Sequence, residues 1–127
     1  MKFYIKKFPV NEAVLFNRAD AVYNEFCDLR AADQESFWIL GLDTEMKAVV
    51  KECIFLGGIN SSVVDLRIVF KRLIYAGAAS FICIHNHPSG NLTPSQEDNA
   101  ITRRLLEGGR ILGINLTDHI IIQQFSF

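Results

Sequence analysis

The run "SFICIHNH", residues 80 to 87, constrains the fold most, because it is almost continuously apolar and ends in two histidines. A strand that covers a core on one face alternates apolar and polar residues, whereas a run this apolar is typical of a central strand covered on both faces. Helices packed against a sheet provide that cover. The sequence therefore predicts an α/β fold built around this strand.

Three further elements are predicted in the first half of the chain. Apolar residues at helical spacing indicate a helix from about Arg18 to Arg30, with Asn17 as the residue that caps its first turn. The runs "ESFWILGL", residues 35 to 42, and "MKAVVKECIFLGG", residues 46 to 58, are rich in β-branched and aromatic residues. We expect them to pair as a β-hairpin.

The second half adds two helices and a last strand. Asp65 is a suitable N-cap for a helix over "LRIVFKRLIYAGA", and a second helix begins at a T-x-x-Q capping box from Thr93 to Gln96. The core-facing residues expected in that second helix are Ile101, Leu105 and Leu112. "LTDHIIIQQF" is the last strand. The order αββαβαβ predicts a mixed sheet flanked by helices, with residues 1–127 forming one domain.

Composition limits the location of the protein. The basic start "MKFYIKKFPVNEAVLF" is interrupted by polar residues, so it does not form the apolar core of a signal peptide. The apolar runs are shorter than the ~20 residues that a membrane-spanning helix needs. The three cysteines, Cys27, Cys53 and Cys83, are widely spaced and form no C-x-x-C pair. These features predict a soluble cytoplasmic protein with reduced cysteines and no membrane partner.

The charge balance limits the partners. A formal net charge of −1 and a pI near 6.3 lack the excess of Lys and Arg that phosphate binding usually requires. The basic pairs Lys71-Arg72 and Arg103-Arg104 lie in helical patterns, where a solvated face is the more common role. We therefore expect only weak or indirect association with nucleic acid. Composition does not determine the oligomeric state.

Polar residues that can bind a metal ion follow the central strand. Side chains alternate along a strand, so His85 and His87 point to one side and Asn86 points to the other. Ser95 and Asp98 lie three residues apart at a helix N-terminus and share a face. Two imidazoles and one carboxylate suit Zn²⁺ and leave its fourth position for a water, whose pKa zinc lowers to about 7.

Each of these residues has a simpler interpretation when it is taken alone. A histidine at a strand end is usually hydrogen-bonded or exposed, and Asp98 could merely complement the helix dipole. Cys83 shares the histidine face but lies deeper, which favours buried packing over metal ligation. His119 lies near the start of the last strand, next to Asp118, and its pattern favours a structural hydrogen bond over direct ligation.

The segment "HNHPSGNLTPSQED" resembles the JAMM signature, H-x-H-x7-S-x-x-D, of the MPN+ metalloprotease fold. The continuing "ITRRLL" and "LGINLTDHIII" are similar to the RadC-like branch of that fold. The resemblance extends from about Glu35 to Ile122. It implies a layered α/β architecture like that of cytidine deaminases, in a short form that lacks the N-terminal helix-hairpin-helix region of longer relatives.

The resemblance also implies a role for each polar residue. Zinc would be held by His85, His87 and Asp98, and Ser95 would hydrogen-bond the developing oxyanion. A glutamate general base is expected where the strand after the first helix begins, and that position is Glu35. Spacing alone leaves three other glutamates open for this role: Glu45, Glu52 and Glu97.

The leading functional hypothesis is a zinc-dependent hydrolase, a metallopeptidase or isopeptidase that uses a zinc-bound water on an unknown protein or peptide substrate. The alternative is a DNA-repair-associated accessory or interaction domain that has the metal site but no proteolytic activity. The near-neutral charge argues against independent DNA binding. The complete set of polar residues argues against an inactive enzyme.

Overall fold

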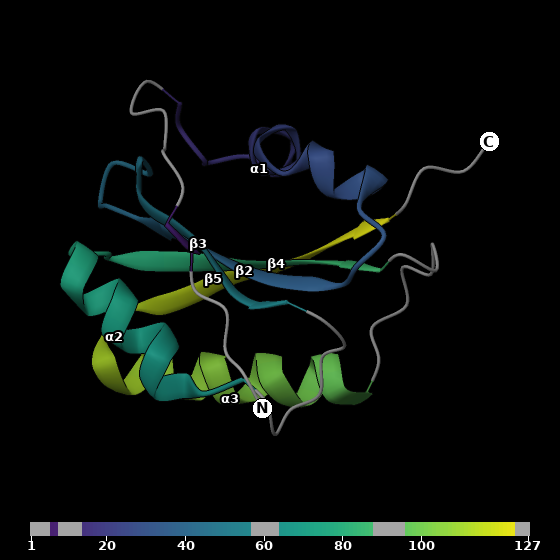
Figure 1. Cartoon of the computed structure of the whole chain (residues 1–127). Helices are drawn as coiled ribbons and strands as arrows, with labels where there is room; N and C mark the ends of the chain where they lie inside the picture. The colour runs from purple at the N-terminus through teal and green to yellow at the C-terminus, as the bar shows by residue number, and fades with distance from the viewer. Residues whose placement is uncertain (1–5, 8–13, 57–63, 88–95, 124–127) are drawn as a thin grey trace.

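The structure is a computed structural model, which describes residues 6–7, 14–56, 64–87 and 96–123 (Figure 1). Its elements confirm the predicted α/β class: a mixed sheet flanked by helices. In chain order they are β1 (Lys6–Lys7), α1 (Ala19–Glu25), the 3₁₀ helix η1 (Cys27–Ala31), β2 (Ser36–Leu42), β3 (Ala48–Leu56), α2 (Leu66–Ala76), β4 (Ser80–His87), α3 (Gln96–Leu112) and β5 (Asn115–Gln123).

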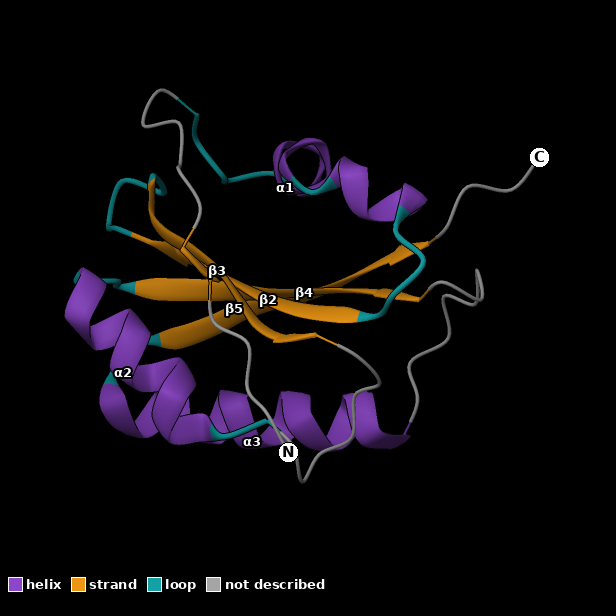
Figure 2. Cartoon of the chain, viewed as in Figure 1, coloured by secondary structure: helices purple, strands orange, loops and turns teal. Residues whose placement is uncertain are grey.

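The sheet has the order β1-β3-β2-β4-β5. Strand β4 pairs with β5 in parallel, and the other neighbouring pairs are antiparallel, including the predicted hairpin of β2 and β3. Strand β4 thus lies between two neighbours, as its apolar sequence predicts. Helices α2 and α3 cover one side of the sheet and α1 covers the other, which gives three layers (Figure 2).

Alternation along the strands assigns residues to the two sides of the sheet. On β4, Phe81 and Cys83 pack into the core on the α2–α3 side, whereas Ile82 and Ile84 pack into the core on the α1 side. His85 continues the first series, so the strand directs it toward α2 and α3. The same alternation that builds the two cores therefore decides which layer receives the histidines.

The helix expected from Arg18 to Arg30 is two elements, and this part of the prediction was wrong. The backbone leaves the α-helical region at Phe26 (φ −113°, ψ 14°), after which the chain continues as η1. Tightening the chain there keeps both Phe26 and Leu29 buried. The N-cap is Arg18, with an extended backbone and no side-chain capping bond, so the Asn17 cap was wrong too.

The helix boundaries on the other side follow the predicted signals more closely. The Asp65 side chain accepts a hydrogen bond from the Arg67 N–H and so caps α2, as predicted. Gly113 follows α3 with a φ of 75°, a conformation that suits glycine. Leu112 is 49% exposed, so its assignment to the core was wrong. The Thr93 part of the capping box lies outside the described residues.

Two further findings concern the edge of the sheet and the length of the helices. The short strand β1 was not predicted; it pairs with β3 at the edge of the sheet. Within the described ranges, no helix is long and apolar enough to cross a membrane.

Candidate metal centre

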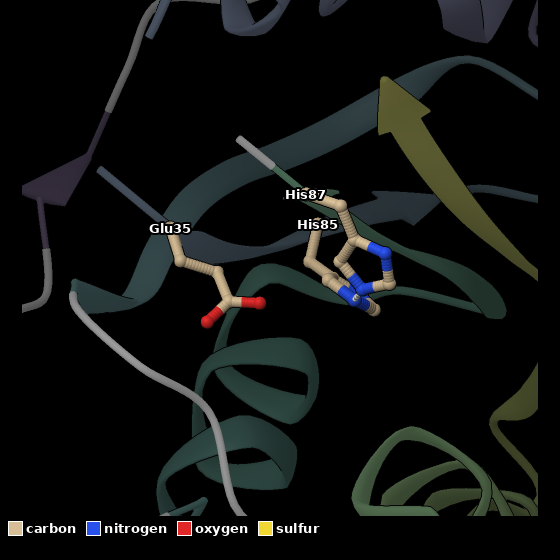
Figure 3. A group of neighbouring side chains, drawn as sticks. All are labelled: Glu35, His85 and His87. Carbon is tan, nitrogen blue, oxygen red and sulfur yellow. Dashed lines mark hydrogen bonds between the residues drawn. The ribbon is translucent and has the colours of Figure 1, made fainter. Parts of the chain in front are cut away.

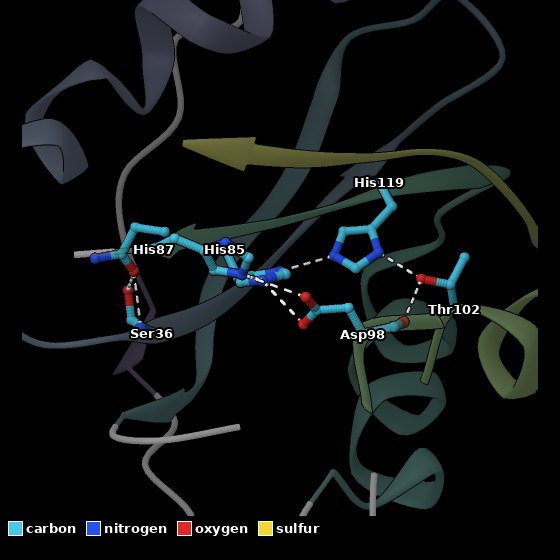
Figure 4. Close-up of polar contacts among 7 residues, drawn as sticks. Ser36, His85, His87, Asp98, Thr102 and His119 are labelled. Carbon is cyan, nitrogen blue, oxygen red and sulfur yellow. Dashed lines mark hydrogen bonds and ion pairs between the residues drawn. The ribbon is translucent and has the colours of Figure 1, made fainter. Parts of the chain in front are cut away.

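Strand β4 and helix α3 bring His85, His87 and Asp98 together on the α2–α3 side of the sheet (Figure 4). Asp98 lies on the same stripe of α3 as the buried residues Ile101 and Leu105, at helical spacing, and is itself only 3% exposed. A surface carboxylate that only complements a helix dipole would remain in water. The burial of Asp98 beside two histidines therefore indicates a role inside the protein.

The three side chains present their electron-pair donors at one point. The Nε2 atom of His85 lies 2.7 Å from His87 Nε2 and 3.0 Å from Asp98 Oδ1. The other carboxylate oxygen, Asp98 Oδ2, is 3.2 Å from His87 Nε2. Ligands about 2.0 to 2.1 Å from a tetrahedral ion stand about 3.3 Å from one another. Two imidazoles and a carboxylate are the kinds of donor that Zn²⁺ takes, and here they lie slightly closer to one another than they would around the ion.

Glu35 directly precedes β2 and faces the two histidines (Figure 3). Phe37 on β2 pairs with His85 on β4, and continuing this antiparallel register by two residues places Glu35 opposite His87. The candidate ligand atoms of Glu35, His85 and His87 lie within 4.8 Å of one another. Glu35, the position that the resemblance singles out, is therefore a second carboxylate beside the histidine pair, in addition to Asp98.

The other glutamates have different surroundings. Glu45 is exposed beyond the end of β2, in the connection to β3. Glu52 is buried on β3, where its Oε2 atom lies 3.5 Å from Arg72 Nε. The side chain of Glu97 lies outside the described part of the chain. Of the two described alternatives, neither joins the cluster of Glu35 and the histidines.

Asn86 connects the histidine strand to the backbone on both sides of Glu35. Its Oδ1 atom accepts from the Ser36 N–H at 2.8 Å and from the Ser36 hydroxyl at 2.9 Å. Its Nδ2 group donates to Gln34 O at 2.9 Å. The neighbours of Glu35 in sequence are thus bound to the residue between the two histidines, which fixes the start of β2 relative to the end of β4.

His119, from β5, lies behind His85. Its Nε2 atom is 2.8 Å from His85 Nδ1, and its Nδ1 atom contacts the hydroxyl of Thr102 on α3. Phe37 packs against both rings, with centroid distances of 6.4 Å to His85 and 6.1 Å to His119. These contacts confirm the sequence interpretation that His119 makes a hydrogen bond.

Burial sets the protonation of these two rings. Removal from water lowers the pKa of His85 to about 3, with a further contribution from the neighbouring His119. Burial also lowers the pKa of His119. Both rings are therefore neutral at neutral pH. A neutral imidazole is the form that binds a metal ion.

The predictions for Ser95 and Cys83 have different outcomes, and two residues at the site were not predicted. Ser95 lies outside the described residues, so its expected contact with an oxyanion stays a prediction. Cys83 is fully buried in the core, as expected. Sequence reasoning missed the roles of Asn86 and Thr102. The only local signal for Asn86 was a polar side chain that points away from the two flanking histidines, toward the apolar side of the strand. Thr102 gave no signal beyond its place one turn after Asp98.

The chain belongs to the family of RadC-like JAB domains, whose family model matches residues 16–127. It is similar to a UPF0758 protein of Bacillus licheniformis, with 49% identity over 124 residues that cover 98% of this chain and 51% of the relative. The UPF0758 protein YsxA of Bacillus subtilis is 49% identical over 100 residues, covering 79% of this chain and 43% of the relative. Membership of this family is consistent with a JAMM-type fold.

The chain spans about half the length of the curated relatives it matches. A UPF0758 protein of Bacillus pumilus, for example, is 47% identical over 100 residues, which cover 79% of this chain and 45% of the relative. The matched part contains the strands and helices that carry the site, because the family model begins before α1 and extends past β5.

Proposed function

We propose that this chain is a zinc-dependent hydrolase of the JAMM type that cleaves amide bonds, as a metallopeptidase or isopeptidase. The observation that carries the proposal is the convergence of two imidazole nitrogens and the Asp98 carboxylate, with Glu35 alongside. His85, His87 and Asp98 would hold the ion. Bound Zn²⁺ would supply a Lewis acid and lower the pKa of a water molecule.

Glu35 would act as the general base in this proposal. Its carboxylate would accept a proton from the attacking water and pass it to the leaving amine. The Asn86 bonds to the residues on both sides of Glu35 support this role, because proton transfer depends on a carboxylate held in a fixed position. From the resemblance, Ser95 would stabilise the oxyanion that develops on the substrate.

Metal analysis tests the ligand set. We expect about one zinc per wild-type chain, and loss of stoichiometric zinc in His85→Ala and in Asp98→Ala. Asp28→Ala is the matched control for Asp98→Ala, because Asp28 is an exposed aspartate on η1, on the other side of the sheet. The control should bind zinc as the wild type does. Full zinc occupancy in both ligand variants would show that the ligand assignment is wrong.

A peptide-library cleavage screen followed by Glu35→Gln tests the reaction. The variant should retain zinc but lose activity by a factor on the order of 10² to 10⁴, the usual contribution of a positioned general base. Glu45→Gln is the matched control, since Glu45 is exposed and away from the site. If Glu35→Gln cleaves at the wild-type rate, Glu35 is not the base. If the zinc-loaded wild type cleaves nothing, the accessory-domain alternative is favoured.

A further inference from the structure

A chain of hydrogen bonds connects two of the proposed ligands behind the metal centre (Figure 4). It begins at His85 Nδ1, which lies 2.8 Å from His119 Nε2. His119 Nδ1 then contacts the Thr102 hydroxyl, which in turn donates to the backbone oxygen of Asp98 at 2.8 Å. The path uses three elements, β4, β5 and α3, and both of its ends lie in ligand residues.

The direction of every bond in this chain follows from its last acceptor. A backbone oxygen can only accept, so the single proton of the Thr102 hydroxyl is donated to Asp98 O. The hydroxyl must then accept from His119 Nδ1, which therefore carries the ring proton. A neutral imidazole has one N–H, so His119 Nε2 has a lone pair and accepts from His85 Nδ1.

The result is a single tautomer for His85. Its proton sits on Nδ1, and its Nε2 lone pair faces His87 Nε2 and Asp98 Oδ1. In the opposite tautomer, a proton on His85 Nε2 would occupy the point where the lone pairs of His85, His87 and Asp98 converge. Metal binding would then first require that proton to leave the ring.

We propose that Thr102 and His119 are positioning residues that fix the tautomer and orientation of His85, so that its Nε2 lone pair is presented to the metal ion. The inference rests on the proposed function, because it concerns the same zinc site. A threonine that bonds to the carbonyl four residues earlier is common in helices. What distinguishes Thr102 is that its hydroxyl oxygen is also used, as the acceptor for the half-buried His119.

Zinc affinity in a set of threonine variants tests this role. Thr102→Val keeps the shape but removes the hydroxyl, and it should weaken zinc binding about 10- to 100-fold, as is typical for groups that orient metal ligands. Thr102→Ser restores the hydroxyl and should bind nearly as the wild type does. Thr117→Val is the matched control, because the Thr117 hydroxyl also donates to a backbone oxygen, that of Phe81, outside this chain of bonds. Competition with a chromogenic chelator measures each affinity.

Histidine ring ¹⁵N NMR of the metal-free protein gives a second readout that does not depend on zinc. Wild-type His85 should show its proton on Nδ1, and Thr102→Val should show a mixture of the two tautomers. His119→Leu removes the acceptor directly and should have the same effect, which covers the case in which Thr102→Val does not fold. Cross-peaks between Nδ1 and the ring protons identify the protonated nitrogen.

The two readouts separate this inference from the proposed function. If wild-type His85 carries its proton on Nε2 in the metal-free protein, the inference is wrong whatever the zinc affinity. Wild-type zinc affinity in both Thr102→Val and His119→Leu would also overturn it. If no protein in the set, wild type included, binds zinc, the proposed metal site fails, and with it the function assigned to the tautomer.

Discussion

At the C-terminal end of β4, the polar side chains on the two sides of the sheet are arranged differently. On the α1 side, Asn86 pairs donors with acceptors: it accepts from Ser36 and donates to Gln34, while the Trp38 ring N–H donates to the Ser36 hydroxyl. On the α2–α3 side, nitrogen and carboxylate lone pairs of His85, His87 and Asp98 approach to between 2.7 and 3.2 Å.

The two groups of polar residues therefore differ in whether their hydrogen bonds are satisfied within the protein. The Asn86 network is neutral, and its bonds are made within the protein, so it needs no ligand to be stable. The histidine cluster collects acceptors around one point, and such a cluster is stable only when a proton or a metal ion lies between them. One strand therefore carries a fixed support on one side and the candidate metal centre on the other.

Replacing Asn86 with alanine should remove the hydrogen bonds on the α1 side of β4 and give the largest loss of stability. Ser36 is only 2% exposed, so its N–H and hydroxyl would remain buried without the partner they now share. Each unsatisfied buried group costs about 1 to 3 kcal/mol, so for these two groups we expect a loss of about 2 to 6 kcal/mol in the free energy of unfolding. Urea denaturation of the zinc-free protein measures it.

Asn99→Ala is the control for that experiment. Asn99 is an exposed residue of α3, so the same chemical change there should alter stability by no more than about 0.5 kcal/mol. Equal losses in the two variants would show that the Asn86 bonds do not support the fold.

Zinc bound on the histidine side of β4 should raise the free energy of unfolding by a smaller amount. A ligand that binds only the folded protein adds about 2.7 kcal/mol when its free concentration is 100 times its Kd. We expect this increment in the wild type and also in Asn86→Ala, and its absence in His85→Ala. Thermal denaturation with and without zinc measures it. An increment that disappears in Asn86→Ala would show that the two sides of β4 are not independent.

The sequence was sufficient where local spacing determines the structure. The apolar run into His85 and His87 predicted a central strand and one shared face, and Asp65 predicted the start of α2. It was less reliable at α1, where the periodic apolar pattern continues through Phe26 although the α-helical backbone ends at Glu25. Periodicity reports which residues are buried, and it does not distinguish an α-helix from a tighter turn that buries the same residues.

The contacts that organise the site were not predictable in this way. Asn86 bonds to residues 50 and 52 positions away in the chain, and His85 meets His119 across 34 positions. Such partners are determined by the register of β4 against β2 and β5, which residue types alone do not specify. Glu35 was singled out by a resemblance, and the register of β2 against β4 explains its position physically.

Cysteine labelling gives the smallest expected effect and extends the comparison into the cores. Thiolates react, and burial raises the pKa of Cys83 well above its usual range and that of Cys53 to about 11, whereas Cys27 on η1 is exposed. We expect an alkylating reagent at neutral pH to modify Cys27 alone in the native protein, and all three cysteines in denaturant. Peptide mass spectrometry identifies each site. Because Cys83 lies on the same side of β4 as His85, two residues deeper, its labelling in the native protein would mean that the histidine side opens to solvent. The candidate metal centre would then not be separated from a core that is closed to solvent.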